Sequence, residues 1–432
     1  MSKPAPSRDD AVRDHVQALE ASGRGAIEEI LYAFEEHHFS AEFLAETGRD
    51  ERRELLAIIA GAAADAGGAM LDESGDEIRL SLLGPTPIAI MFRVEPSPPF
   101  AINALRVEDA DESPPRIELS WDNAEATFRQ LESEGFSGVV HLSRDGRIVV
   151  EKAYGSSNEE LGFRTRLDTI YGIGSTPIDF TVTALFLLVQ DGKVRLDDRV
   201  TAYFADVPDD KLDMTLTQLI TGQSGLQDFH DVPGDWDPDL GWIDRDEAVA
   251  RILAEPLRFV PGQGEAHSHS AYGLVAAIVE IVSGKSYFDF LRERIFIPAG
   301  MTRTGMYGDR AGFAIRDFAE GRGARAVGIP NIPPNWGPTS WLVMGSGGMY
   351  STLTDMLRFY SFVRSNKRFE PEHARRWSGE FVSMGGSERG FYMFHVFRDQ
   401  DAEAMLLING EGRSPEMRSL SQALEALVMG GQ

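Results

Sequence analysis

One feature constrains the fold most. Segments that look like paired strands lie far apart in the sequence, some near residue 140 and some near the C-terminus. "FSGVVHLSRDGRIVVEKAYG" contains two β-rich runs around Asp145-Gly146, a pair suited to the positive φ of a hairpin turn. Near the C-terminus, "RGFYMFHVFRDQ" and "AEAMLLINGE" have the pattern of two more antiparallel strands. Apolar helical segments such as "DFTVTALFLLVQ" lie between them. This order predicts an α/β sandwich: a mixed or antiparallel sheet flanked by helices, with a helical insertion.

The length of 432 residues favours two domains, because a domain of about 150 residues is typical. An N-terminal stretch with helical spacing is followed by "EIRLSLLG" and "IAIMFRVE", which alternate with the period of two typical of strands. The segment 108–123 is acidic, contains proline and has weak patterning, so it predicts a linker. We therefore expect a small α+β N-terminal domain over 1–118 and a larger domain over 119–432.

Charge and composition exclude several classes of function. The net charge is −26, from 68 acidic and 42 basic side chains, and this field repels nucleic acid and anionic membrane surfaces. The absence of cysteine excludes disulfides, cysteine-ligated metals and thiol catalysis. The N-terminal residues lack an apolar secretion signal, and no apolar run is long enough to span a bilayer. We expect a cytoplasmic protein.

A candidate nucleophile lies in "GIGSTPIDFT" (172–181), where a small-residue turn presents Ser175 before an apolar helix. A serine hydroxyl needs a base in hydrogen-bond contact to become an effective nucleophile at neutral pH. One helical turn later stands Ile178, whose side chain has no lone pair. A serine just before a proline is also a good helix N-cap, so both interpretations of Ser175 stay open.

Further stretches share their order and spacing with one known superfamily. They are "GFSGVVHLSRDGRIVVEKAYG", "IGSTPIDFT", "DGKVRLDDRVTAYFADVP", "LTQLITGQSGLQDF", "RFVPGQGEAHSHSAYGLVAAIVEIVSGKSYFDFL", "IFIPAGMTRTGM", "GSGGMYSTLTDMLRF" and "GGSERGFY". From about residue 125 to 428, the chain resembles the serine β-lactamase and D-alanyl-D-alanine peptidase superfamily, in its class C and esterase-like branch. The resemblance implies a β-lactamase-like fold and three motifs, S-x-x-K, Y-x-N and K-T-G or H-x-G.

The first two motifs are degenerate in this chain. Ser175 matches the nucleophile of S-x-x-K, but Ile178 takes the place of the lysine that helps to remove its proton. His267 takes the place of the tyrosine in Y-x-N, and His269 that of the asparagine. Loss of the family's base implies loss of several orders of magnitude in rate, unless another group replaces it.

The third motif has also lost its polar group. Met384 takes the place of the lysine or histidine, whereas Gly386 is retained and the oxyanion-hole N–H is expected from Ser387. Without the cationic group, a substrate carboxylate has no anchor, so β-lactamase activity is not expected. Together with Ile178, Met384 indicates a pocket for a neutral or apolar small molecule.

His267 is the predicted replacement base. Imidazole titrates near neutrality, and at the tyrosine position its ring could reach Ser175 directly or through one water. Glu265 or Asp179 could orient it. The alternative is that His267 only fills the pocket and bonds to the backbone.

The stretch "EAHSH" allows a second chemistry. In an extended segment Glu265, His267 and His269 project to one face, where two imidazoles and a carboxylate can hold a divalent transition ion. The spacing is short and common by chance. We therefore predict neither a metal nor another cofactor.

Three functions follow from these residues. The first is a hydrolase or acyl transferase that acts on a neutral ester, amide or thioester through Ser175 and His267. The second is an inactive relative that binds a small ligand or a partner without turnover, with a homodimer as one possible assembly. The third is a lyase, isomerase or metal-type activity of His267 and His269 without covalent serine chemistry.

Overall fold

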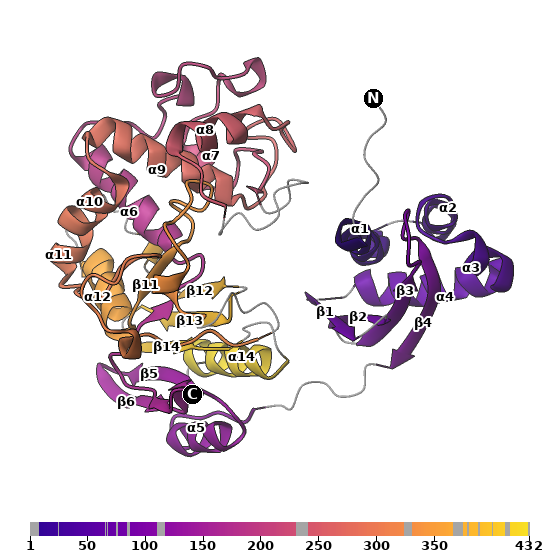
Figure 1. Cartoon of the computed structure of the whole chain (residues 1–432), viewed down its shortest axis with the longest axis horizontal. Helices are drawn as coiled ribbons and strands as arrows, with labels where there is room; N and C mark the ends of the chain where they lie inside the picture. The colour runs from indigo at the N-terminus through magenta and orange to yellow at the C-terminus, as the bar shows by residue number, and fades with distance from the viewer. Residues whose placement is uncertain are drawn as a thin grey trace. The chain divides into compact units, whose positions relative to one another are not determined.

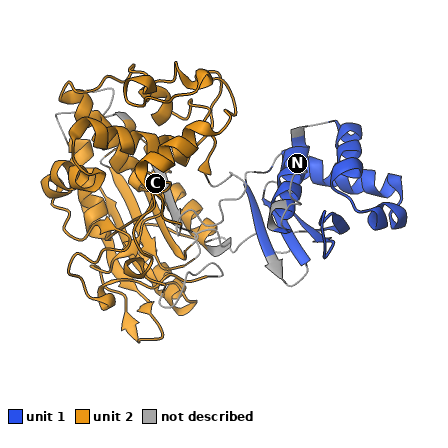
Figure 2. Cartoon of the chain, turned by 45° about the horizontal axis from the view of Figure 1, so that its top comes forward, with its two compact units in different colours: residues 1–116 blue, residues 117–432 orange. Residues whose placement is uncertain are grey.

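The computed structural model divides the chain into two compact units, residues 1–116 and 117–432 (Figure 2). The predicted boundary after residue 118 lies next to this division, and residues 110–116 of the predicted linker lie outside the described residues. The structure describes residues 8–24, 26–64, 66, 68–74, 77–83, 87–109, 117–229, 241–323, 331–365, 375–377, 380–387, 389–399, 401–410 and 415–430.

The first unit packs helices against an antiparallel sheet with strand order β1-β2-β3-β4. Strand β2 alternates between buried and half-buried residues, which explains the period of two in its sequence. Its buried side chains pack with Leu31, Phe34 and Leu56 from the helices. The elements are α1 (Arg8–Ala21), a 3-10 turn (Ser22–Arg24), α2 (Ile27–His37), α3 (Ala41–Glu46), α4 (Arg49–Ala64), β1 (Gly68–Ser74), β2 (Glu77–Leu83), β3 (Ile88–Val94) and β4 (Ile102–Asp109).

The second unit is built on a five-stranded sheet with order β12-β13-β14-β5-β6, so strands from both ends of the unit lie side by side (Figure 1). All four strand pairs are antiparallel. The β5–β6 turn has φ of 50° at Asp145 and 71° at Gly146, as the sequence predicts. The strands are β5 (Gly138–Arg144), β6 (Arg147–Tyr154), β12 (Glu380–Ser387), β13 (Phe391–Arg398) and β14 (Ala402–Ile408).

Helices cover both faces of this sheet. Alternate residues of β5 point to opposite faces, so Val140 packs with Phe128 of α5 (Ala124–Ser133) and Leu420 of α14 (Pro415–Met429). Val139 belongs instead to the larger core on the other face. That core contains side chains from α6 (Pro177–Gln190), α9 (His269–Ser283) and α12 (Leu353–Ser365). The predicted sandwich with a helical insertion is confirmed.

The second unit also contains shorter helices, helical turns and strands. None of the helices in the described part of the chain is long and apolar enough to cross a membrane. The helices are α7 (Leu216–Ile220), α8 (Arg245–Ala254), α10 (Tyr287–Leu291), a π-helical turn (Arg292–Phe296), α11 (Ile297–Ala299) and 3-10 turns at Val200–Ala202, Asp209–Lys211, Ile315–Asp317, Pro333–Asn335 and Arg375–Trp377. The short strands are β7 (Ser156–Asn158), β8 (Phe163–Arg164), β9 (Tyr171–Gly172), β10 (Gly305–Met306) and β11 (Met349–Ser351).

A buried carboxylate anchors the first turn of α6. Asp179 is 5% exposed and accepts a hydrogen bond of 2.9 Å from the Tyr360 hydroxyl of α12. Its other oxygen lies 3.5 Å from the Arg376 guanidinium. The pairing matters because a charge without partners in the interior costs several kcal/mol.

The charged cluster continues toward the sheet. The ring of Tyr360 lies 4.2 Å from that of His395, which is hydrogen-bonded at 2.8 Å to Glu403. Burial opposes the ionisation of Glu403, but its hydrogen bond with His395 and its ion pair with Arg364 outweigh this effect and lower its pKa to about 2. Glu403 is therefore a carboxylate at neutral pH, and the cluster joins α6 and α12 to the sheet.

Tyr360→Phe should lower the free energy of unfolding by about 1–3 kcal/mol, because it leaves one oxygen of the buried Asp179 carboxylate without its donor. Urea unfolding followed by tryptophan fluorescence measures this, and it reports on the second unit, where all six tryptophans lie. The matched control is Tyr203→Phe, which removes a bond to the half-buried Asp198 and should cost less than about 1 kcal/mol. Equal losses in the two variants would contradict the role of the buried cluster.

Two buried histidines pair in the first unit. The Nδ1 atoms of His15 and His38 are 2.9 Å apart, and His15 Nε2 lies 3.0 Å from the carbonyl oxygen of Phe100. Since a carbonyl only accepts, His15 is protonated on Nε2, and its Nδ1 accepts the Nδ1–H of His38. Burial lowers the pKa of both histidines, that of His38 to about 4, and the neighbouring His15 contributes to the shift of His38.

Acid should therefore destabilise the first unit. A lowered pKa means that the unfolded chain binds more protons below about pH 6.5, so the stability that His38 contributes above that pH, ~3 kcal/mol, is lost as the pH falls toward 4. Hydrogen exchange of the β2–β4 amides, corrected for the intrinsic pH dependence, should show lower protection at pH 5 than at pH 7.

His38→Gln should flatten this pH dependence, whereas His37→Gln should change it much less, because the side chain of His37 is 65% exposed and its charge is the smallest contribution to the lowered pKa of His38. Protection that stays constant between pH 7 and pH 5 in the unaltered protein would show that the buried pair does not control stability.

Candidate active site

A strand–turn–helix connection presents Ser175. Strand β9 pairs with β11 through Gly172 and Tyr350, and Gly174 then takes a φ of 55°, which suits a residue without a side chain. Helix α6 starts at Pro177, and the residue at its N-cap is Thr176, without a side-chain capping bond. The capping alternative for Ser175 is therefore not observed. The backbone N–H of Ser175 donates to no backbone carbonyl among the described residues.

The side chain in contact with Ser175 is that of His269. The Ser175 Oγ and the His269 Nε2 are 3.0 Å apart, although the two residues are 94 positions apart in the chain. His269 is the first residue of α9, which packs alongside α6. The sequence predicts this contact for His267, whereas the structure has it for His269, the residue at the start of α9.

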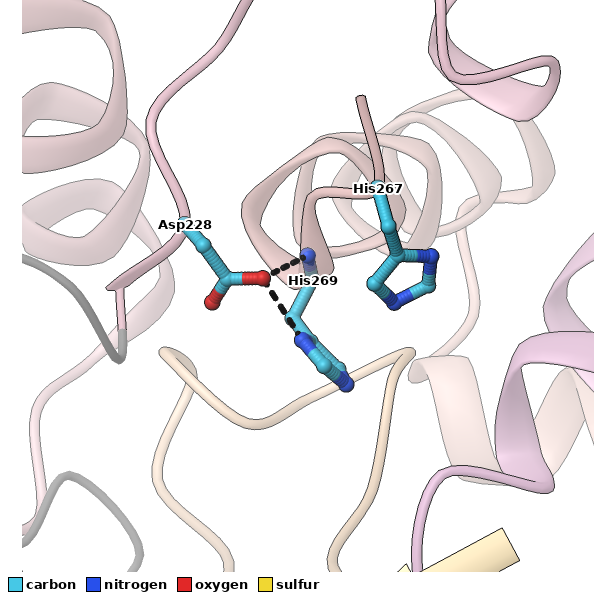
Figure 3. A group of neighbouring side chains, drawn as sticks. All are labelled: Asp228, His267 and His269. Atoms are coloured by element: carbon cyan, nitrogen blue, oxygen red, sulfur yellow. Dashed lines mark hydrogen bonds and ion pairs between the residues drawn. The ribbon is translucent and has the colours of Figure 1, made fainter. Parts of the chain in front are cut away.

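Asp228 orients His269 through two hydrogen bonds to one carboxylate oxygen (Figure 3). The backbone N–H of His269 lies 2.9 Å from Oδ2, and the ring Nδ1 lies 2.7 Å from the same atom. Next to this contact, the Ser268 hydroxyl donates to the carbonyl of Gln227 at 3.1 Å. The segment before α9 is thus tied to the loop that carries Asp228.

These contacts determine which nitrogen of His269 can accept a proton. A carboxylate accepts hydrogen bonds, so the proton of the neutral ring is on Nδ1. Nε2 then accepts a hydrogen bond from the Ser175 hydroxyl. Asp228 and His269 have only 9% and 17% of their side chains exposed, which limits competition from water. The carboxylate–imidazole–hydroxyl series is that of a serine hydrolase triad.

The predicted orienting carboxylates do not have this role. Asp179 is engaged with Tyr360 and Arg376, and Glu265 is exposed. Asp228 was not among the residues singled out from the sequence. It is the second-to-last residue of the stretch "LTQLITGQSGLQDF", so an acidic residue inside a matching segment was the available signal.

His267 lies beside the triad. Its ring is edge-on to that of His269, with centroids 4.6 Å apart (Figure 3). The centroid of the Tyr272 ring is 5.9 Å away. His267 is exposed, whereas Asp228 is buried, and the two histidines and Asp228 each offer one ligand atom within 4.8 Å of the others. Among the described residues, this group replaces the predicted Glu265, His267 and His269 set as the candidate for holding a metal ion.

Ile178 occupies the core, as expected for an aliphatic side chain. It is 9% exposed and belongs to the main hydrophobic cluster, and its N–H bonds to the carbonyl of Ser175 at 3.1 Å. The imidazole in contact with Ser175 comes from α9, whereas a lysine at position 178 would have come from the serine's own helix.

Strand β12 carries the third motif. Met384 pairs with Phe394, Gly386 with Tyr392 and Ser387 with Phe391. Thr176, next to the nucleophile, donates to the sulfur of Met393 at 3.4 Å on the adjacent strand β13. The side chains of Met384 and Ser387 lie outside the described residues, so the pocket role of Met384 and the oxyanion role of Ser387 stay predictions.

Curated relatives include several hydrolases. A D-aminopeptidase of Brucella anthropi is 29% identical over 251 residues, which are 57% of this chain but only 46% of that protein. Penicillin-binding protein 4* of Bacillus subtilis is 29% identical over 335 residues, 69% of this chain and 74% of that protein. Teichoic acid D-alanine hydrolase of Staphylococcus aureus is 25% identical over 268 residues, 62% of this chain and 64% of that protein.

Solved structures share the fold. A D-amino acid amidase of Ochrobactrum anthropi, complexed with L-phenylalanine amide, superposes with a TM-score of 0.58 at 22% identity, over 71% of this chain and 98% of that one. An octameric penicillin-binding protein homologue of Pyrococcus abyssi gives 0.57 at 21% identity, over 72% and 78%. Residues 123–415, more than half of the chain, match the family model named Beta-lactamase. The protein therefore belongs to the Beta-lactamase family and has its serine hydrolase fold.

Proposed function

We propose that the protein is a serine hydrolase or acyl transferase with Ser175 as nucleophile, His269 as general base and Asp228 as the group that orients the base. One observation carries the proposal: the Ser175 hydroxyl is 3.0 Å from His269 Nε2, and Nδ1 of the same ring is 2.7 Å from a buried carboxylate. Both distances are within hydrogen-bond range for a nucleophile–base pair.

The reaction follows from these contacts. As Ser175 Oγ attacks the acyl carbon, its proton moves to His269 Nε2, and Asp228 stabilises the imidazolium that forms. The imidazolium then gives its proton to the leaving group, which departs and leaves an acyl-serine. Water, or an acceptor alcohol or amine, releases the acyl group in a second addition with the same base. The N–H groups of Ser175 and Ser387 are the proposed donors to the oxyanion.

The proposed substrate is a small neutral acyl compound. The aliphatic Ile178 is buried next to the nucleophile, and methionine stands where the family uses a cationic or imidazole group. A D-aminopeptidase and a teichoic acid D-alanine hydrolase are among the relatives, so D-aminoacyl amides and esters are the first compounds to test. β-Lactams, which carry a carboxylate, are not expected substrates. The cytoplasmic location and the homodimer remain predictions from the sequence.

A fluorophosphonate probe tests the nucleophile. We expect the unaltered protein to be labelled on Ser175, Ser175→Ala to lose labelling, and His269→Gln to slow it by at least about 100-fold, because the hydroxyl then lacks its base. Measurement is by intact mass and peptide mapping.

His267→Gln is the matched control, since it alters the neighbouring imidazole without removing the bonded one. Labelling that depends on His267 and not on His269 would overturn the assignment of the base. A folded protein that resists high probe concentrations would favour the alternative of a relative that binds a ligand without turnover.

Asp228→Asn tests the orienting group. The amide can present a donor to His269 Nδ1, which favours the wrong tautomer, so kcat with an activated ester should fall by about 100- to 10,000-fold while KM changes little. The control is Glu265→Gln, which neutralises an exposed carboxylate close in the sequence to His269 and should have little effect on kcat. The assignment fails if the Glu265 variant loses rate and the Asp228 variant does not.

A further inference from the structure

The group formed by Asp228, His267 and His269 has the chemistry of a transition-metal site. Each residue offers one ligand atom, and these three atoms lie within 4.8 Å of one another (Figure 3). Two imidazoles and a carboxylate suit zinc and its neighbours, whereas Mg²⁺ and Ca²⁺ prefer oxygen ligands alone. The Ser268–Gln227 hydrogen bond ties the two backbone segments together, so Asp228 and His269 are already held in place.

Only a small rearrangement is needed for an ion to bind. Zinc–nitrogen and zinc–oxygen bonds are about 2.0–2.2 Å long, so three ligands of a tetrahedral ion lie roughly 3.3–3.6 Å apart. The ligand atoms lie at most 4.8 Å apart, so the widest pair must approach by about 1 Å. If His269 Nδ1 and Asp228 Oδ2 are two of the ligands, these atoms, now 2.7 Å apart, must separate by less than about 1 Å. His267 is the exposed member of the group, so its side chain has the most room for this movement.

We propose that Zn²⁺ binds to Asp228, His267 and His269 and reversibly switches off the serine site. This inference rests on the proposed function. The ion needs a lone pair of His269, and either nitrogen gives the same result. If the ion binds Nδ1, the remaining proton of the ring must be on Nε2, which can then no longer accept from Ser175. If the ion binds Nε2, it occupies the lone pair that would otherwise accept the proton of Ser175.

The geometry favours zinc as an inhibitor over zinc as a cofactor. Without an ion, the carboxylate, imidazole and hydroxyl already form a continuous hydrogen-bonded series, with distances of 2.7 Å and 3.0 Å. Metal binding breaks that series at the His269 imidazole, which lies between the carboxylate and the hydroxyl. His267 contributes to the metal group, whereas the bond to the Ser175 hydroxyl is made by His269, so a change at His267 separates the two roles.

The test uses the full-length protein after treatment with a chelator. Isothermal titration calorimetry with ZnCl₂ should show one site per chain, and saturating Zn²⁺ should slow fluorophosphonate labelling by at least tenfold, with recovery after EDTA is added. His267→Gln should weaken Zn²⁺ binding and raise the inhibitory Zn²⁺ concentration by at least tenfold, each variant being compared with its own metal-free rate. His37→Gln, on an exposed histidine of the first unit, should match the unaltered protein. MgCl₂ should have no effect.

The outcomes separate this inference from the proposed function. Absence of Zn²⁺ binding, binding that His267→Gln does not weaken, or binding that leaves labelling unchanged would each overturn the inhibitory site. In a protein that is never labelled, Zn²⁺ binding that depends on His267 would support the metal group and would contradict the serine hydrolase. Labelling that depends on Ser175 and His269 but is insensitive to Zn²⁺ would support the serine hydrolase and contradict the inhibitory metal site.

Discussion

The site depends on the hydrogen bonds between one buried carboxylate, Asp228, and one histidine, His269. Asp228 accepts both the backbone N–H and the ring N–H of His269, so it fixes where α9 begins and how the ring is turned. Charge-assisted hydrogen bonds of this kind are roughly twice as strong as neutral ones. Because the oxygen can only accept, it also sets the tautomer that leaves Nε2 available to Ser175. Without Asp228 the imidazole would lose the acceptor that places its proton on Nδ1.

The proposed function implies that this family fold can take its base from a different helix. In the S-x-x-K pattern the nucleophile and the lysine share one helix, and position 178 here is aliphatic and buried in the core. The imidazole instead comes from the neighbouring helix, and the packing of α6 against α9 sets the distance between hydroxyl and ring. The Asp179–Tyr360 bond anchors the first turn of α6, so the cluster that links this helix to α12 also supports the nucleophile.

Local sequence patterns predicted the strands and turns of the fold better than the contacts of the site. The Asp145-Gly146 turn and the strands near the C-terminus have clear signals, and their antiparallel pairing completes the main sheet. The sequence pattern points to His267, whereas the structure has His269 bonded to Ser175, and the difference has a physical reason. Alternation in an extended segment puts His267 and His269 on one face, but α9 starts at His269, and the helical turn separates their directions. Asp228 lies in a loop 41 positions earlier, and no spacing rule connects it to the histidine.

The protonation state of the His269 ring tests this account most directly. In protein with ¹⁵N-labelled histidine at neutral pH and without metal, NMR should show His269 as the neutral tautomer with its proton on Nδ1 and an unprotonated Nε2, and Asp228→Asn should abolish that preference. A ring whose proton lies on Nε2 in the unaltered protein could not accept from Ser175, and would contradict the central claim.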